Sequence, residues 1–208
     1  MASFRSHISY YFCEMNIIDF SFLEASSIAG LFATALLTLN LLLGMLVSTD
    51  FKKSQYFQRL PKQLKTINLL ELHNKTAYFA LGMVILHPVL LVLDKSSKFT
   101  LVDVLLPINA PFEKFYVAFG TISLYLLLLV VISSQKKVKQ LMGLKTWKYL
   151  HFASYLTAIL FTVHGIMLDP ELKNRPVDFL DAEKLVSEMC LLVLIIATVL
   201  RFRYQLKR

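Results

Sequence analysis

The chain has few of the residues on which many soluble proteins depend. Cysteine occurs only twice, as Cys13 and Cys190, and the pair forms no CxxC motif. This excludes a disulfide framework and a c-type haem attachment signal. Carboxylates are also scarce in the long apolar runs, where only Glu71 and Glu188 occur, both near an end. That scarcity argues against a dinuclear carboxylate site.

A secretory signal is also missing from the N-terminal segment. Residues 1–24 contain aromatic and acidic side chains, with no continuous apolar core and no small-residue cleavage site. We therefore expect this segment to be a loosely ordered arm or a short interfacial helix. The remaining residues, 25–208, are expected to form one transmembrane domain.

Hydrophobic side chains dominate the sequence. The 208 residues are 56% hydrophobic, with a mean hydropathy of +0.59. Several apolar runs are long enough to cross a bilayer as helices. We predict an all-α integral membrane protein, a bundle of five transmembrane helices. Ser26 and Ser27 could cap the first helix. In the loop after it, Pro61 would interrupt any helix. The predicted spans are Ile28–Val47, Leu69–Leu93, Phe115–Ser133, Trp147–His164 and Leu185–Leu200.

Basic residues alternate from loop to loop. The net charge is +8, but the Lys and Arg residues cluster between apolar segments, so they indicate membrane topology and not nucleic-acid binding. The first and third loops and the C-terminus hold 14 basic residues against one acid, whereas the opposite side holds seven against eleven. Cytoplasmic loops carry the excess of Lys and Arg. We expect a plasma or inner membrane location, in contact with lipid, with the N-terminus outside and the C-terminus cytoplasmic.

Histidine is placed unusually. His73 and His87 lie in the second predicted span and His151 and His164 in the fourth, whereas His7 lies elsewhere. Ionisable residues inside a membrane segment are costly and mark functional sites. At 1.5 Å per residue, each pair is separated along its helix by about 20 Å, so one histidine lies near each membrane face.

The predicted topology pairs these histidines across the two helices. Both helices run in the same direction, so His73 and His151 are near the cytoplasmic face and His87 and His164 near the outer face. Each pair could hold one haem iron from both axial sides, whereas zinc would need three or four converging ligands. A 13-residue step misses its starting face by about 140°. The fourth span must therefore bend, or its histidines must reach their partners from different sides.

For other residues near the histidines, the sequence allows either a role at the cofactor or a purely structural role. Lys75 and Lys148 could pair with haem propionates or reach out to the membrane interface. Aromatic side chains between the two levels could line haem edges or simply pack, and Pro88 could kink its helix. These aromatic residues are Tyr78, Phe79, Phe152, Tyr155 and Phe161.

Three stretches of the sequence carry a resemblance. The stretches are LHNKTAYFALGMVILHPVLLVL, GTISLYLLLLVVISS and LKTWKYLHFASYLTAILFTVHGIML. Through them the chain resembles the ferric reductase-like transmembrane domain family, over roughly Ile28 to Leu200. That family includes ferric reductases, NADPH oxidases and the haem-binding membrane subunit of the methionine sulfoxide reductase system. The unequal spacing of the two histidine pairs is typical of it, as is the placing of Trp147 four residues before His151 and of Tyr155 four after.

The resemblance implies two b-type haems, with His73, His87, His151 and His164 as axial ligands and Trp147 and Tyr155 beside the cofactor. Two departures matter. Members often have six spans with the histidines on the third and fifth, so the first helix of the family is absent here or reduced to residues 1–24. Members with flavin and nicotinamide domains continue further, whereas this sequence stops at Arg208. We therefore expect the haem membrane subunit of an oxidoreductase, which does not itself oxidise NADPH.

Three functions remain open from the sequence. The first is a transmembrane electron-transfer subunit that takes electrons from a cytoplasmic flavoprotein and passes them to ferric iron, oxygen or a partner reductase outside. The second is a quinol-linked di-haem cytochrome b subunit. The third is a non-catalytic haem sensor or membrane scaffold. The sequence does not choose among electron donors and acceptors.

Overall fold

The computed structural model describes residues 21–49, 51–168, 180 and 182–206. Within these residues the chain is entirely helical, and five helices are long and apolar enough to cross a membrane. The prediction of an all-α membrane protein with five spans is confirmed. The long helices are α2 (Phe22–Ser48), α5 (Leu69–Leu93), α7 (Lys114–Ser133), α8 (Lys136–Met167) and α9 (Ala182–Leu206).

Helix α2 begins earlier than predicted. Its N-cap is Ser21, whose side chain accepts a hydrogen bond from the Glu24 amide while the Glu24 carboxylate accepts one from the Ser21 amide. This reciprocal capping box satisfies two amides at the helix start. The predicted cap at Ser26 and Ser27 is therefore wrong, because both lie inside the helix. Phe22 to Glu24 form the first turn of α2, and residues 1–20 of the expected arm lie outside the described residues.

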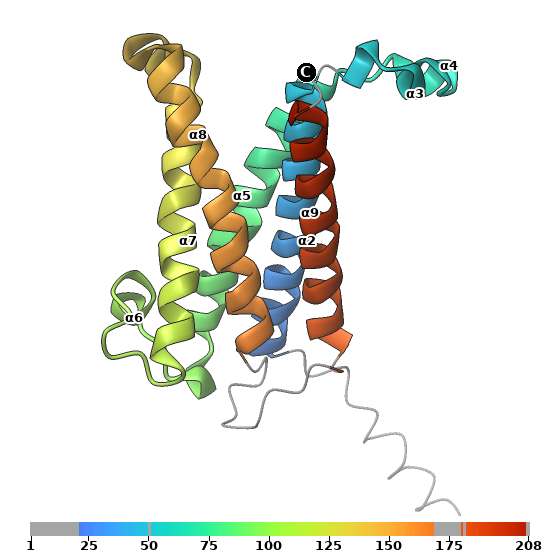
Figure 1. Ribbon diagram of the computed structural model, residues 1–208. Helices are drawn as coiled ribbons and strands as arrows, with labels where there is room; N and C mark the ends of the chain where they lie inside the picture. The colour runs from blue at the N-terminus through green and yellow to red at the C-terminus, as the bar shows by residue number, and fades with distance from the viewer. Residues whose placement is uncertain (1–20, 50, 169–179, 181, 207–208) are drawn as a thin grey trace, which may run out of the picture.

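The long helices pack in two antiparallel pairs (Figure 1). Helix α2 lies along α5, α7 lies along α8, and α9 packs against α2 and α8. Helices α5 and α8 run in the same direction, as the sequence predicted (Figure 1). Small side chains at Ala33 and Ala80 let α2 and α5 approach closely. They belong to a buried cluster with Leu37, Val84, Leu127 and Phe161.

Short helices connect the spans. The first connection contains η1 (Phe51–Lys53), α3 (Gln55–Gln58) and α4 (Lys62–Lys65), and α3 ends before Pro61, as expected. The connection from α5 to α7 contains η2 (Lys95–Ser97) and α6 (Leu101–Leu105). Figure 1 places these two connections at opposite ends of the bundle.

Helix α8 is longer than its apolar run, because Lys, Gln, Leu and Met before Trp147 are good helix formers. It is interrupted at Gly143, whose φ of 78° lies in the left-handed region that glycine tolerates. No other described residue within α8 departs from helical angles. The break therefore separates a lysine-rich first segment from the membrane-spanning part.

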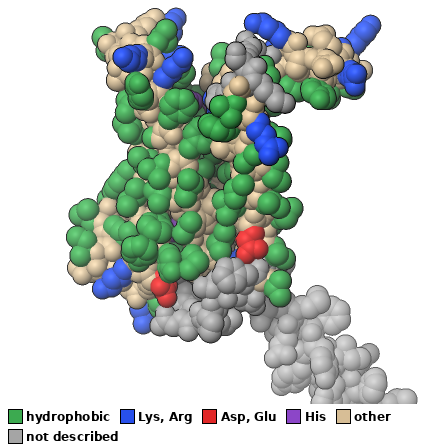
Figure 2. Space-filling view, in the orientation of Figure 1, with side chains coloured by type: hydrophobic (Ala, Val, Ile, Leu, Met, Phe, Trp, Pro, Cys, Tyr) green, Lys and Arg blue, Asp and Glu red, His purple; other side chains and the backbone are tan. Residues whose placement is uncertain are grey.

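The outer surface of the bundle is apolar. Figure 2 shows hydrophobic side chains along the length of the helices and most charged side chains toward the ends. Phe32, Phe79, Tyr125 and Ile159 are among the large side chains left exposed on the long helices. Such a surface suits contact with lipid.

Candidate functional site

The structure brings the four histidines of α5 and α8 together in two pairs. The ring centres of His73 and His151 are 6.2 Å apart, with an angle of 72° between ring planes. The ring centres of His87 and His164 are also 6.2 Å apart, with an angle of 81°. These are the pairs at matching depth that the sequence predicted. Their role as metal ligands remains a prediction.

The spacing within each pair suits two imidazoles on one metal. A metal–nitrogen bond of about 2 Å, plus roughly 1 Å from the nitrogen to the ring centre, puts two coaxial rings about 6 Å apart. Both pairs match this value. Among the described residues, no three His, Cys, Asp or Glu side chains converge on one point. Each pair therefore offers two ligands, which is the number that the axial positions of a haem iron require.

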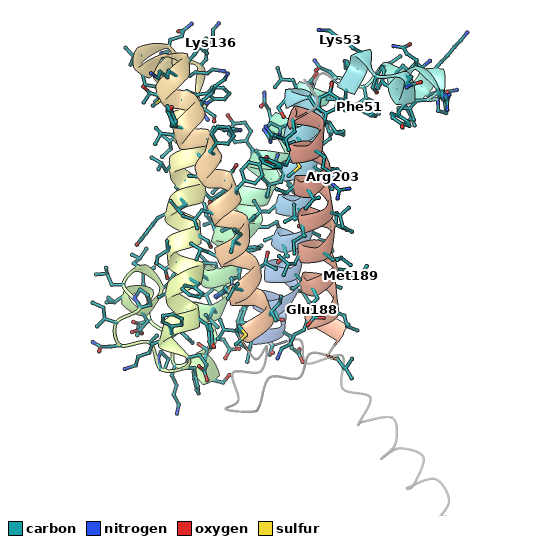
Figure 3. The ribbon with its side chains drawn as sticks, in the orientation of Figure 1. Phe51, Lys53, Lys136, Glu188, Met189 and Arg203 are labelled. Atoms are coloured by element: carbon teal, nitrogen blue, oxygen red, sulfur yellow. The ribbon has the colours of Figure 1, made fainter. Side chains whose placement is uncertain are left out.

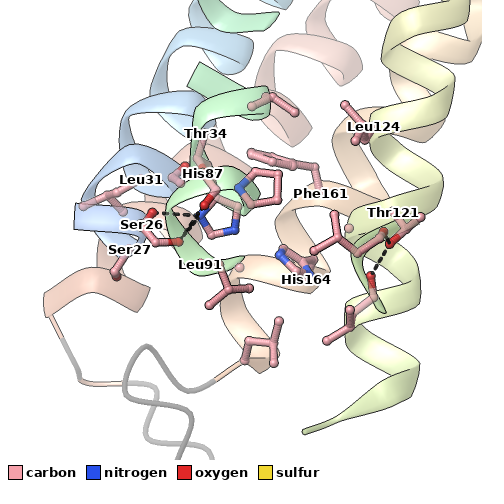
Figure 4. Close-up of a pocket in the computed structure, with 18 of the residues that line it drawn as sticks. Ser26, Ser27, Leu31, Thr34, His87, Leu91, Thr121, Leu124, Phe161 and His164 are labelled. Carbon is pink, nitrogen blue, oxygen red and sulfur yellow. Dashed lines mark hydrogen bonds between the residues drawn. The ribbon is translucent and has the colours of Figure 1, made fainter. Parts of the chain in front are cut away.

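Figure 4 shows His87 and His164 at a cavity between the helices. Its wall is mostly apolar and includes Leu124, Phe161 and Pro88. A few hydroxyl groups, among them those of Ser26 and Thr121, also lie in the wall. An apolar cavity with a few placed polar groups is typical of a cofactor site.

The α5 histidines bind helix α2 through their Nδ1 atoms. His87 Nδ1 lies 2.7 Å from the Ser26 carbonyl oxygen, and His73 Nδ1 lies 3.0 Å from the Asn40 carbonyl oxygen. The same two α2 residues also donate to the histidine backbone. Ser26 Oγ donates to the His87 carbonyl at 2.8 Å, and Asn40 Nδ2 donates to the His73 carbonyl at 2.6 Å. Each α5 histidine is thus held at both ring and backbone.

The Nδ1 atoms of the α8 histidines contact α7 and its C-cap residue, Ser134. His164 Nδ1 lies 2.8 Å from the Tyr116 carbonyl oxygen, and His151 Nδ1 lies 3.3 Å from Ser134 Oγ. Metal-bound histidines characteristically donate their other ring N–H to a carbonyl or similar acceptor, which fixes the tautomer and orients the ring. With Nδ1 engaged in all four rings, Nε2 is the nitrogen left for a metal.

Glycines make room for three of these rings. An added Cβ at Gly30 would lie 3.1 Å from the His87 ring, and at Gly44 it would lie 3.2 Å from the His73 ring. At Gly120 it would lie only 2.6 Å from the His164 ring. At these three positions helices α2 and α7 therefore present bare backbone to the histidine rings.

Sequence reasoning missed these supporting residues, although one signal was present. Gly30 and Gly44 are separated by 14 positions, as are Ser26 and Asn40, and the same step separates His73 from His87. On antiparallel helices, equal steps along both chains keep the contacts at equal depths. The matching spacing on α2 therefore indicated which residues face the histidines.

The segment of α8 between His151 and His164 is an uninterrupted helix. From His151 to His164 the backbone keeps helical angles, and the one interruption, Gly143, precedes both. A step of 13 residues leaves the two side chains on different sides of the helix. This favours the second of the two arrangements, in which the histidines would reach their haems from different sides, and that arrangement remains a prediction.

Trp147 lies directly at the His73/His151 pair. Its ring stacks on the His151 ring at 5.0 Å between centres, with 29° between planes. Its Nε1 donates to Ser134 Oγ at 3.3 Å, and Lys139 Nζ lies 3.6 Å from the centre of its ring. Trp147 thus links the ring of His151 to the acceptor of that ring.

The other three predicted site residues have different surroundings. Tyr155 pairs through its hydroxyl with Arg201 of α9, one helical turn after His151. Lys75 makes an exposed ion pair with Glu71, with its Nζ 2.7 Å from the carboxylate. Lys148 is exposed. The side chain of Lys75 is therefore engaged by Glu71 and that of Tyr155 by Arg201, and their roles at a cofactor, like that of Lys148, remain predictions.

A comparison with protein families identifies the chain. The family described as ferric reductase like transmembrane component matches residues 29–162. The chain belongs to this family. Membership makes it a membrane protein of a kind that typically binds haem and transports electrons. The matched range contains His73, His87 and His151 and ends two residues before His164.

No curated protein matches the ferric reductase-like chain.

Proposed function

We propose that this ferric reductase-like protein carries electrons across a membrane through two b-type haems. His73 and His151 would ligate one haem and His87 and His164 the other. The observation that carries this proposal is the common arrangement of the four rings, which are paired at 6.2 Å with every Nδ1 held by a neighbouring helix. The bound haems would supply an iron that cycles between its ferric and ferrous states.

The protein would hold, space and insulate the two sites. Because each pair would supply two imidazole ligands, a haem held there would serve electron transfer and not the binding of an acceptor at its iron. Between the two levels lies the buried apolar cluster around Leu37 and Phe161. This cluster keeps water out of the space between the histidine pairs and provides the low-dielectric surroundings that tune a haem potential.

The charge pattern supports an orientation for this transfer. Lys53, Lys136 and Arg203 lie toward one end of the bundle and Glu188 toward the other (Figure 3). By the positive-inside rule, the lysine-rich end faces the cytoplasm. Electrons would enter at His73 and His151 from a separate flavoprotein and leave at His87 and His164. Ferric iron, oxygen or a partner reductase would be the acceptor outside.

The first test is the haem content of the purified protein. We expect a red preparation with a bis-histidine b-type spectrum and two haems per chain by pyridine haemochrome analysis. A colourless protein would contradict the proposal and favour a scaffold, and one haem per chain would remove one of the two sites.

Single histidine substitutions test the ligands. His151→Ala should remove the inner haem and block electron entry. His164→Ala should leave the inner haem reducible but stop outward transfer. Haem content and reduction kinetics would be measured beside His7→Ala, which substitutes the fifth histidine. Unchanged haem content in both site variants would show the ligand assignment to be wrong.

The electron donor separates the proposal from the quinol-linked alternative. A pull-down from solubilised membranes should recover a flavin-containing protein that reduces the haems. Reduction by a quinol in the absence of any flavoprotein would instead identify a quinol-linked cytochrome b.

A further inference from the structure

The four Nδ1 contacts are not equivalent. His73, His87 and His164 each face a backbone carbonyl, at 3.0, 2.7 and 2.8 Å, and His87 Nδ1 also lies 3.1 Å from Ser26 Oγ. His151 instead faces a hydroxyl, Ser134 Oγ, at 3.3 Å. That hydroxyl also accepts a hydrogen bond from Trp147 Nε1, at 3.3 Å. One of the four rings therefore has a more distant acceptor, which it shares with a second donor.

Positive charge is also distributed unequally between the two pairs. Two cations, Lys139 and Arg201, lie beside aromatic residues of α8 that are four positions from His151. Lys139 lies over Trp147, which stacks on His151, and Arg201 lies beside Tyr155 one turn further along α8. Among the described residues, no cation–ring contact lies within one helical turn of His87 or His164 along the chain.

Both differences change the reduction potential in the same direction. A strong acceptor at Nδ1–H makes the imidazole a more basic ligand, which stabilises ferric iron over ferrous iron. A weak, shared acceptor makes the imidazole less basic, so it stabilises ferric iron less. A nearby cation also disfavours the additional positive charge of the ferric state, most strongly in a low-dielectric site.

We propose that the haem held by His73 and His151 has a more positive reduction potential than the haem held by His87 and His164, and that Ser134 and Trp147 set this difference. The inference rests on the proposed function. Ser134 and Trp147 are positioning residues that act through His151. A protein that has received one electron would hold it at the inner pair, and removal of electrons by the outside acceptor would drive the outward step.

The experiment is a redox titration of the haem-loaded full-length protein in lipid nanodiscs. Dithionite would be the reductant and ferricyanide the oxidant, with optical and electron paramagnetic resonance detection. Two midpoints are expected. The single-haem variants His164→Ala and His151→Ala assign the more positive one to the inner haem. Equal midpoints, or the reverse order, would overturn the inference while leaving the proposed function intact.

Two substitutions should shift the inner midpoint in opposite directions. Ser134→Ala removes the acceptor of His151 and should make the inner midpoint more positive. Trp147→Phe keeps an aromatic ring but leaves Ser134 Oγ to His151 alone, so it should make that midpoint more negative. Ser133→Ala is the matched control, because Ser133 is buried next in sequence but donates to the Val130 carbonyl.

The outer midpoint is the internal reference in each variant. Shifts of the same sign in Ser134→Ala and Trp147→Phe, or shifts confined to the outer haem, would contradict the proposed roles. Haem content is measured first in every sample. Fewer than two haems in the unsubstituted protein would overturn the proposed function, and the inference with it.

Discussion

Gly120 allows the His164 ring to lie directly against helix α7. A Cβ at this position would lie 2.6 Å from Cε1 of the ring, closer than real Cβ contacts come. The obstacle is a ring whose Nδ1, itself 2.7 Å from that Cβ, is held by the Tyr116 carbonyl, so the ring cannot simply rotate away. Gly82, in contrast, has no atom within 4 Å of an added Cβ. The two glycines therefore allow a matched comparison.

Gly120→Ala should displace His164 and lower the occupancy of the outer haem while the inner haem is retained. Overpacking of this kind typically costs about 1–3 kcal/mol. Haem stoichiometry and the thermal midpoint would be measured beside Gly82→Ala. The control should keep both haems and lose no stability, because alanine favours a helix over glycine by about 0.5–1 kcal/mol. Equal haem content in the two variants would refute a close packing role for Gly120.

At the scale of the helices, Asp94 joins two of them. It follows the end of α5, and its carboxylate accepts from the Leu23 amide in the first turn of α2 at 2.9 Å. It also accepts from the amides of Ser96 and Ser97, at 2.8 and 3.3 Å. The joint lies at the end of the bundle that contains Ser26 and His87. It therefore ties α5, which carries His87, to α2, which holds the ring of His87.

The stability of this joint should depend on pH. The hydrogen bond from the Ser96 side chain is the largest of the contacts that hold the pKa of Asp94 below its ordinary value. The bonded carboxylate therefore contributes stability above the ordinary pKa and loses it as the pH falls through the lowered one. At neutral pH, Asp94→Asn should lower the thermal midpoint. The difference in thermal midpoint between this variant and the unsubstituted protein should disappear at acidic pH.

Asp103→Asn is the control for Asp94. The pKa of Asp103 is also lowered, chiefly by the Thr100 side chain, but its contacts lie within the capping box of α6. It should therefore affect the bundle less than Asp94→Asn does. If the difference in thermal midpoint between Asp94→Asn and the unsubstituted protein did not change with pH, the ionised carboxylate would not be the stabilising form.

At the scale of the whole molecule, charge divides the two ends of the bundle. The connection that contains α3 and α4, the lysine-rich start of α8 and the end of α9 all lie at one end (Figure 1). The connection that contains α6 lies at the other. Only one orientation places the lysine-rich end in the cytoplasm, and under the proposed function it would put the pair His73 and His151 on the side of the electron donor.

Cysteine labelling tests the orientation. In a background with Cys13 and Cys190 changed to serine, Gln58→Cys should react with a membrane-impermeant maleimide only after the cytoplasmic side is opened. Asn109→Cys should react from outside in intact cells. Both positions are exposed, one before α4 and one between α6 and α7. The reverse pattern would invert the proposed direction of electron transfer.

The sequence by itself determined the five spans, the common direction of α5 and α8, and the depths of the four histidines. Hydropathy, charge and residue spacing act locally along the chain, and for this reason these features can be read from it. The bounds of α5 were predicted to the residue, but the start of α2 was not, because the capping box lies before the apolar run.

Only the tertiary structure decided how each histidine is held. The acceptors at Asn40 and Tyr116 are backbone carbonyls, which every residue has, so no residue type marks them in the sequence. The hydroxyl at Ser134 became an acceptor only when α7 packed against α8. The 14-residue step shared by α2 and α5 indicates which α2 residues face the histidines, but which atom accepts from each ring depends on how the helices pack.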